Sequence, residues 1–244
     1  MVHTLPDYTT KYKTSTITAI ADNAELAARL GSIDTFDRRG NVIWMDNFEG
    51  TTLLWRINGG AGYTCVLNAT YALTGSQSCK MTTGGVAANN WATIYRTLAY
   101  PVACNIGFEI SSTYHEDILY YYWYMHFYTG ALDIFPFIRY DDTNNVLQYY
   151  DRVGAWQTFA TDVNMEMTSE SFNTCKLVAN FVDMEYERFI YNDVTYDLSG
   201  IALNAMNNLL PSRLGVYFGI VADGVKVLNT WADSAIVTQN EEAQ

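Results

Sequence analysis

The sequence predicts an all-β protein, built as a two-sheet antiparallel sandwich that follows an extended arm and one short helix. Short runs of β-branched and aromatic residues recur at about ten-residue spacing, with Gly, Asn and Asp between them. Strands do not alternate with helical patterns, which argues against an α/β fold. Apolar residues form 49% of the 244-residue chain, enough for the core of one large β domain.

Residues 1–41 are predicted to form the arm and the helix. The beginning of this segment is Thr-rich and polar, without an apolar period. Asp22 and Glu25 then match a capping box and Gly31 supplies a stop, which predicts a helix over residues 22–30. So short a helix is not stable alone, so we expect it to dock on the body or on a neighbouring subunit.

The sandwich domain is predicted to span residues 42–244. Each expected strand is a short apolar or alternating run bounded by turn residues. We expect strands over residues 42–45, 54–55, 72–81, 92–97, 106–112, 118–128, 134–140, 146–151, 156–159, 214–222 and 226–235. Residues 176–200 predict a three-stranded meander with an acidic first turn and an Asn192-Asp193 second turn.

The acidic turn of this meander allows two interpretations. On one continuous strand Asp183, Glu185 and Glu187 would share a face at spacings of about 7 Å, which a glycosidase could use. Alternatively, residues 184–187 form an exposed hairpin turn in which the acids are solvated. We favour the turn, because the strand pattern restarts at Phe189.

Residues 118–128, ILYYYWYMHFY, form the most aromatic run of the predicted sandwich. Side chains alternate between faces along a strand, so one face must be core. The first face carries Tyr120, Tyr122, Tyr124 and His126, and the second carries Tyr121, Trp123, Met125 and Phe127. The phenol-rich face suits a subunit interface, a sugar-binding groove, or an inner face covered by loops of the same chain. Further candidates for stacking on sugars are Trp91, Trp123 and Trp156.

Charge narrows the possible partners. The formal net charge is −12, which argues against binding to nucleic acid or to an anionic membrane surface. No apolar run approaches the ~20 residues that cross a bilayer. Residues 1–20 lack the basic and apolar regions of an export signal, so we expect synthesis in the cytoplasm. The four cysteines form no CxxC pair, and no cofactor is expected.

The order of several motifs resembles concanavalin A-like and laminin-G-like jelly-roll sandwiches, including carbohydrate-binding modules. These motifs are Phe48-Glu49, the run ALTGSQSCKM over residues 72–81, the hairpin within residues 176–200, and Trp231-Ala232-Asp233. The resemblance implies a structural calcium ion held by Glu49 and Asp233, with ordinary surface acids as the alternative. The runs HTLPDYTTKYK, NAELAARLGS and FDRRGNV of the arm resemble virion-type proteins.

The sequence contains little that matches a known catalytic motif. Phe108-Glu109-Ile110-Ser111 resembles the catalytic strand of laminarinase-like enzymes, but Ser111 replaces the expected Asp. The next acids, Glu116 and Asp117, are too distant to share that face. No histidine accompanies a Gly-x-Ser-x-Gly elbow or a zinc-binding spacing. We therefore expect a protein that is not an enzyme.

Three functions follow, in order of preference. The first is a structural subunit of a virus or phage particle, such as a capsid decoration or fibre protein. It would form a homo-oligomer, contact capsid or other virion proteins, and be located in the virion. The second is a carbohydrate-binding module, which would bind a glycan and be extracellular. The third is a glycoside hydrolase or lyase of the same fold.

Overall fold

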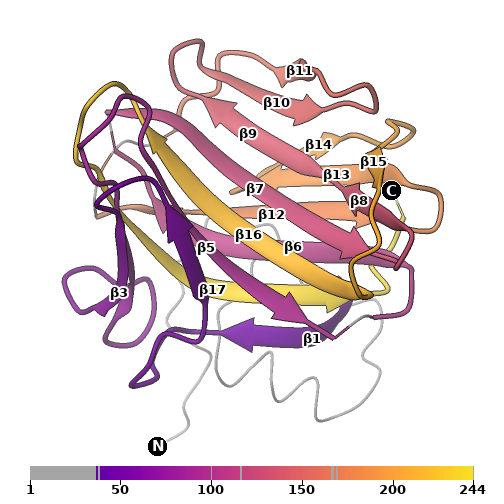
Figure 1. The fold of residues 1–244 in the computed structure, drawn as a ribbon, viewed down its shortest axis with the longest axis horizontal. Helices are drawn as coiled ribbons and strands as arrows, with labels where there is room; N and C mark the ends of the chain where they lie inside the picture. The colour runs from indigo at the N-terminus through magenta and orange to yellow at the C-terminus, as the bar shows by residue number, and fades with distance from the viewer. Residues whose placement is uncertain are drawn as a thin grey trace, which may run out of the picture.

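The computed structural model describes residues 37, 39–99, 101–115, 117–165, 168 and 170–243. These residues form two antiparallel sheets packed face to face (Figure 1), which confirms the predicted all-β jelly-roll sandwich. The described residues contain no helix, and hence none that could cross a membrane. The predicted helix over residues 22–30 and nearly all of the predicted arm lie outside the described part of the chain.

Sheet A has eight strands. Seven of them lie in the order β14 (Val194–Asp197), β13 (Glu185–Tyr191), β12 (Phe172–Asn180), β6 (Asn105–Thr113), β17 (Asn229–Gln239), β4 (Ser78–Thr82) and β3 (Thr64–Asn68). The eighth, β1 (Asn41–Asp46), pairs with the second half of β17, whereas β4 pairs with its first half. The β17 strand therefore joins β1 to the rest of sheet A.

Sheet B has nine strands and lies in front of sheet A in Figure 1. Seven follow the order β11 (Trp156–Ala160), β10 (Val146–Tyr150), β9 (Phe137–Asp141), β7 (Ile118–Tyr128), β16 (Arg213–Ala222), β5 (Trp91–Leu98) and β2 (Arg56–Gly59). The end of β7 also pairs with β8 (Leu132–Phe135), which pairs in turn with β15 (Asn204–Asn207). The long strands β7 and β16 thus form the centre of the sheet.

The predicted meander over residues 176–200 is present as β12, β13 and β14. Its turns contain Met184 and Asn192, both at positive φ (57° and 49°). However, β13 begins at Glu185, so the prediction of an exposed turn over residues 184–187 is wrong. Glu187 is only 7% exposed, because the bulged pairing of β12 and β13 draws it into the sheet.

Other boundaries differ from the predictions for local reasons. The strand expected over residues 134–140 is split at Pro136, which lacks the N–H needed to continue a ladder, into β8 and β9. Residues 54–55 and 72–77 form loops rather than strands. The short strands β2, β3 and β15 were not predicted, because they are mostly exposed and show no clear apolar alternation.

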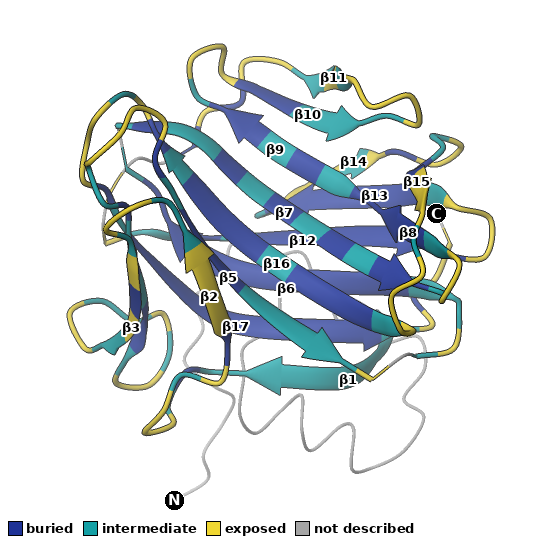
Figure 2. Cartoon of the chain, viewed as in Figure 1, coloured by how far each residue is buried: buried dark blue, intermediate teal, exposed yellow. Residues whose placement is uncertain are grey.

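The core lies between the sheets and is rich in aromatic residues. Alternation along β7, β16 and β9 appears in Figure 2 as buried residues separated by half-buried ones. The largest fully buried apolar side chains are Trp123, Tyr114, Tyr121, Tyr140, Tyr186, Phe48, Phe108, Phe127, Phe189 and Phe218. Trp123 therefore belongs to the core, which corrects its prediction as a sugar-stacking residue.

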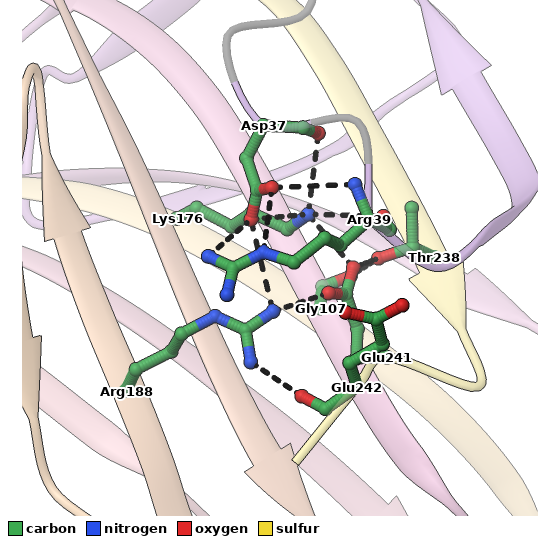
Figure 3. A network of polar contacts seen from close by, with 8 residues as sticks. All are labelled: Asp37, Arg39, Gly107, Lys176, Arg188, Thr238, Glu241 and Glu242. Carbon is green, nitrogen blue, oxygen red and sulfur yellow. Dashed lines mark hydrogen bonds and ion pairs between the residues drawn. The ribbon is translucent and has the colours of Figure 1, made fainter. Parts of the chain in front are cut away.

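A buried ionic cluster, which we call the clasp, holds both ends of the described chain on the outer face of sheet A (Figure 3). Lys176 Nζ lies 2.7 Å from Glu241 Oε1 and 3.2 Å from Asp37 Oδ2. Arg188 Nη2 pairs with Glu241 Oε2, and its Nη1 donates to the Glu242 carbonyl at 2.7 Å. The side chains of both cations are fully buried, so they need these partners to offset lost hydration.

The clasp also requires a glycine beneath it. A Cβ atom at Gly107 of β6 would lie 2.9 Å from both Glu241 Oε1 and Lys176 Cε. Burial acts to raise the pKa of Asp37, but Lys176, Arg39 and Arg188 together hold that pKa well below its usual range. Asp37 therefore stays ionised at neutral pH, and the segment before β1 is fixed to the sandwich.

Replacing Glu241 with Gln should destabilise the fold by about 3–5 kcal/mol, because Lys176 and Arg188 would lose a buried carboxylate. Urea unfolding at neutral pH would measure the loss. The matched control is Glu170→Gln, an exposed acid, which should change stability by no more than about 0.5 kcal/mol. Equal stability of the two variants would contradict the structural role of the clasp.

Candidate ligand-binding cleft

The predicted alternation of β7 is confirmed residue by residue. Tyr121, Trp123, Met125 and Phe127 are fully buried between the sheets. Tyr120, Tyr122, Tyr124 and His126 are half-buried on the outer face of sheet B. Strand alternation alone therefore turns one aromatic run into a core layer and an accessible strip.

Two glycines of the neighbouring strand β16 make room for this strip. Gly219 is paired with Tyr122 and Gly215 with His126, on either side of Tyr217. A Cβ atom at Gly219 would overlap the Tyr122 ring, and one at Gly215 would lie 2.7 Å from the Tyr217 ring. The phenol rings can therefore lie close against the sheet backbone, where they form the floor of a hollow.

The hollow is a pocket of about 360 Å³ on the outer face of sheet B. It is lined by Trp91 from β5, by Tyr122, Tyr124 and His126 from β7, and by Phe135 and Phe137 from β8 and β9. The structure thus brings four of the six predicted ligand or interface residues together. The sequence did not identify Phe135 and Phe137, although their alternation after Asp133 could have indicated them.

The other two predicted residues, Tyr120 and Trp156, both contact Arg139 of β9. The Arg139 Cζ atom is 4.3 Å from the centre of the Tyr120 ring and 4.1 Å from that of Trp156. Arg139 Nε donates to Gln148 Oε1 at 2.8 Å. Trp156 also meets Phe137 edge-on at 4.9 Å between ring centres, which connects this cation to the pocket. We call the pocket and this extension the cleft.

A histidine and an aspartate pair at the opposite end of the cleft. His126 Nδ1 lies 2.8 and 3.0 Å from the two carboxylate oxygens of Asp133, which is only 3% exposed. Such a contact orients the imidazole and favours the proton on Nδ1. The other ring nitrogen, Nε2, is then the one available to a molecule in the pocket.

Two phenols of the cleft and the neighbouring Tyr217 hold their protons at neutral pH. Burial raises the pKa of Tyr122, Tyr124 and Tyr217 well above the ordinary value for tyrosine. The Tyr122 hydroxyl is engaged with Thr93 Oγ1 of β5. The Tyr124 hydroxyl makes no hydrogen bond within the described part of the chain, so it can donate to a bound molecule.

The predicted calcium ligands lie away from the cleft, around a loop beside β17. Glu49 accepts hydrogen bonds from the Ser76 amide and hydroxyl and from the Gln77 amide, at 2.7–2.9 Å. Asp233 accepts from the amides of Leu73, Thr74 and Ser234. Each carboxylate therefore accepts hydrogen bonds from backbone amides of the loop over residues 73–77 and fixes that loop. No three His, Cys, Asp or Glu side chains gather as a metal site among the described residues. Calcium stays a prediction.

The carboxylates considered for a glycosidase are also outside the cleft. Glu109 is buried in β6, and Glu185 and Glu187 belong to β13, all in sheet A. Ser111, which replaces the expected Asp, bonds to Thr174 of the neighbouring strand at 2.7 Å. None of these acids can act on a molecule bound to the outer face of sheet B.

No family model matches the sequence, and no curated protein matches it. Among solved structures, the cellulose-induced protein Cip1 has a TM-score of 0.51 and 15% identity, over 82% of this chain and 99% of that one. An endo-β-1,4-glucuronan lyase from the fungus Trichoderma reesei has a TM-score of 0.54 and 10% identity, over 82% and 96%. At these identities the likeness concerns the fold alone.

The lyase corrects the prediction that the chain is not an enzyme, because the same fold carries catalysis there. The prediction depended on the absence of a paired-carboxylate or histidine motif in the sequence. His126 and Asp133 belong to different strands and meet only through the pairing of β7 with β8, so no familiar local motif reveals them.

Replacing Gly219 with Ala should displace the Tyr122 ring and destabilise the protein by about 1–3 kcal/mol, since the added methyl group overlaps that ring. Urea unfolding would measure this effect. Gly50→Ala is the matched control, because the nearest atom to its Cβ is 3.6 Å away and its φ is not positive. Equal stability of the Gly219→Ala variant and this control would contradict the close packing of the Tyr122 ring on Gly219.

Asp233 should make stability decrease as pH rises. Burial raises its folded pKa from 3.8 to about 6, and the charge of Glu49 contributes. Between these values the folded state keeps a proton that the unfolded state has lost, so raising the pH favours unfolding. Urea unfolding at several pH values should show that Asp233→Asn removes this decrease. An unchanged slope in the variant would refute the assignment.

Proposed function

We propose that this chain binds a polysaccharide in the cleft of sheet B. The observation that carries the proposal is the pocket lining, in which aromatic rings from four strands surround a hollow of about 360 Å³. Aromatic faces stack on the apolar faces of sugar rings, and phenol, imidazole and indole tips supply hydrogen bonds.

The shape of the site favours an extended ligand over a single sugar. Tyr120 and His126 are six residues apart on β7, which corresponds to about 20 Å of strand. Trp156 and Arg139 extend the surface beyond the pocket. A chain of several sugar units therefore matches the cleft better than a monosaccharide.

The fold is consistent with this class of ligand. One neighbour is named for its induction by cellulose and another for its action on glucuronan. A subunit interface, a virion location and a homo-oligomer stay predictions. Part of the strip lines a shallow pocket of about 360 Å³, which has room for a small ligand and favours a ligand over a second copy.

The test is binding of the purified protein to a panel of neutral and acidic polysaccharides, measured by affinity electrophoresis and calorimetry. Tyr124→Ala and Trp91→Ala should each weaken binding about five- to tenfold, because each removes an aromatic contact of roughly 1 kcal/mol.

Tyr71→Ala is the matched control for these variants. This half-buried tyrosine packs edge-on against Trp231 of sheet A, away from the cleft. Its removal should leave polysaccharide affinity unchanged. Absence of binding to every polysaccharide in the panel, or an equal loss in all three variants, would overturn the proposed function.

A further inference from the structure

One end of the cleft gathers groups that sugar binding alone does not require. His126 and Asp133 form the pair described above, and the Tyr128 ring stacks on the imidazole at 5.4 Å with an interplanar angle of 13°. Arg213 of β16 places its Cζ atom 4.6 Å from the centre of the same Tyr128 ring. The His126 imidazole and the Arg213 guanidinium therefore both contact the Tyr128 ring.

Each member of this group has a defined protonation state or orientation. The carboxylate of Asp133 holds the His126 proton on Nδ1 and would stabilise the imidazolium after Nε2 takes a second proton. Arg213 forms no ion pair with the described residues, so its guanidinium can donate hydrogen bonds to a carboxylate of a ligand. Tyr124 meets the His126 ring edge-on at 5.4 Å between ring centres and keeps its proton at neutral pH.

The acids of the cleft do not provide the pair that glycoside hydrolysis uses. Both oxygens of Asp133 face His126 Nδ1, and Asp141 Oδ2 accepts a hydrogen bond from Asn144 at 3.0 Å. Asp141 is also only 5% exposed. A base, a proton donor and a cation are present instead, and these are the groups that remove a proton next to a carboxylate.

We propose that this end of the cleft cleaves a uronate-containing polysaccharide by β-elimination. Arg213 pairs with the carboxylate of one uronate unit and thereby makes the adjacent C5 proton more acidic. His126 Nε2 takes that proton, and the electron pair of the C–H bond becomes the C4–C5 double bond. The C4–O bond breaks, and Tyr124 gives its proton to the departing oxygen. Proton return from His126 to Tyr124 restores both groups, so the reaction needs no co-reactant.

A second cation supports an acidic ligand. Arg139 is paired in register with Tyr122, four residues from His126, which corresponds to about 13 Å along β7. This separation exceeds one sugar unit, so Arg139 can contact the carboxylate of a different unit. Arg139 and Arg213 place two positive charges along the cleft, although the chain has a net charge of −12. This local positive charge favours a ligand with acidic sugars.

The inference rests on the proposed function, because the polysaccharide must lie in the cleft. The test incubates the full chain with glucuronan, polygalacturonate and alginate, and with xylan as the neutral control. Ultraviolet absorbance detects the conjugated double bond of an unsaturated product, and a reducing-end assay counts all cleavage. We expect absorbance and reducing ends to rise together on at least one acidic polymer, and neither to rise on xylan.

Variants then assign the roles. His126→Gln should lower turnover at least about hundredfold while affinity changes little, because the base is lost and the rings remain. Asp133 is a positioning residue. Asp133→Asn should lower kcat with little change in KM, because the imidazole loses the carboxylate that fixes its orientation and its Nδ1 proton. A residue that only supports the shape of the pocket would raise KM instead. Tyr196→Phe, which removes one hydroxyl in sheet A, is the control and should match the parent.

The outcomes separate the two proposals. Binding without any unsaturated product from the three acidic polymers would overturn the elimination and leave the proposed function standing. Reducing ends without the double bond would show hydrolysis and also overturn it. No binding to any polysaccharide would overturn both. Full turnover by a folded His126→Gln variant would exclude His126 as the base.

Discussion

Alternation along β7 is the constraint on which the site depends. The strand is central in sheet B and carries aromatic residues on both faces, so it supplies the core and the cleft at the same time. Burial of Tyr121, Trp123 and Phe127 against sheet A determines where the outer side chains point. A shift of one residue in register would exchange the two faces, so the core holds the cleft in place.

The outer faces of the two sheets differ in what covers them. Sheet A buries charged residues there, and the clasp fastens the segments before β1 and after β17 across it. Sheet B instead has a pocket on its outer face among the described residues, where glycines of β16 let phenol rings lie close to the backbone. The segments next to β1 and β17 are therefore fixed on the face opposite the cleft.

Local patterns in the sequence predict much of this arrangement. The alternation of residues 118–128 and the three strands of the 176–200 meander depend on side chains within one strand or hairpin, and both are confirmed. The pairing of His126 with Asp133 could not be predicted in the same way, because it needs the chain to turn at residues 129–131 and β8 to pair with the end of β7. The clasp joins residues more than 130 positions apart, and no local pattern records it. Glu185 and Glu187 were misplaced because a short acidic run resembles a turn until its partner strand is known.

The most direct test of the central claim is a crystal structure of the His126→Gln variant with a short uronate oligosaccharide. The account predicts sugar rings against Trp91 and Tyr124, with one carboxylate within hydrogen-bond distance of Arg213. Oligosaccharide bound on sheet A or at the loops, with the sheet B cleft empty at saturating concentration, would contradict it.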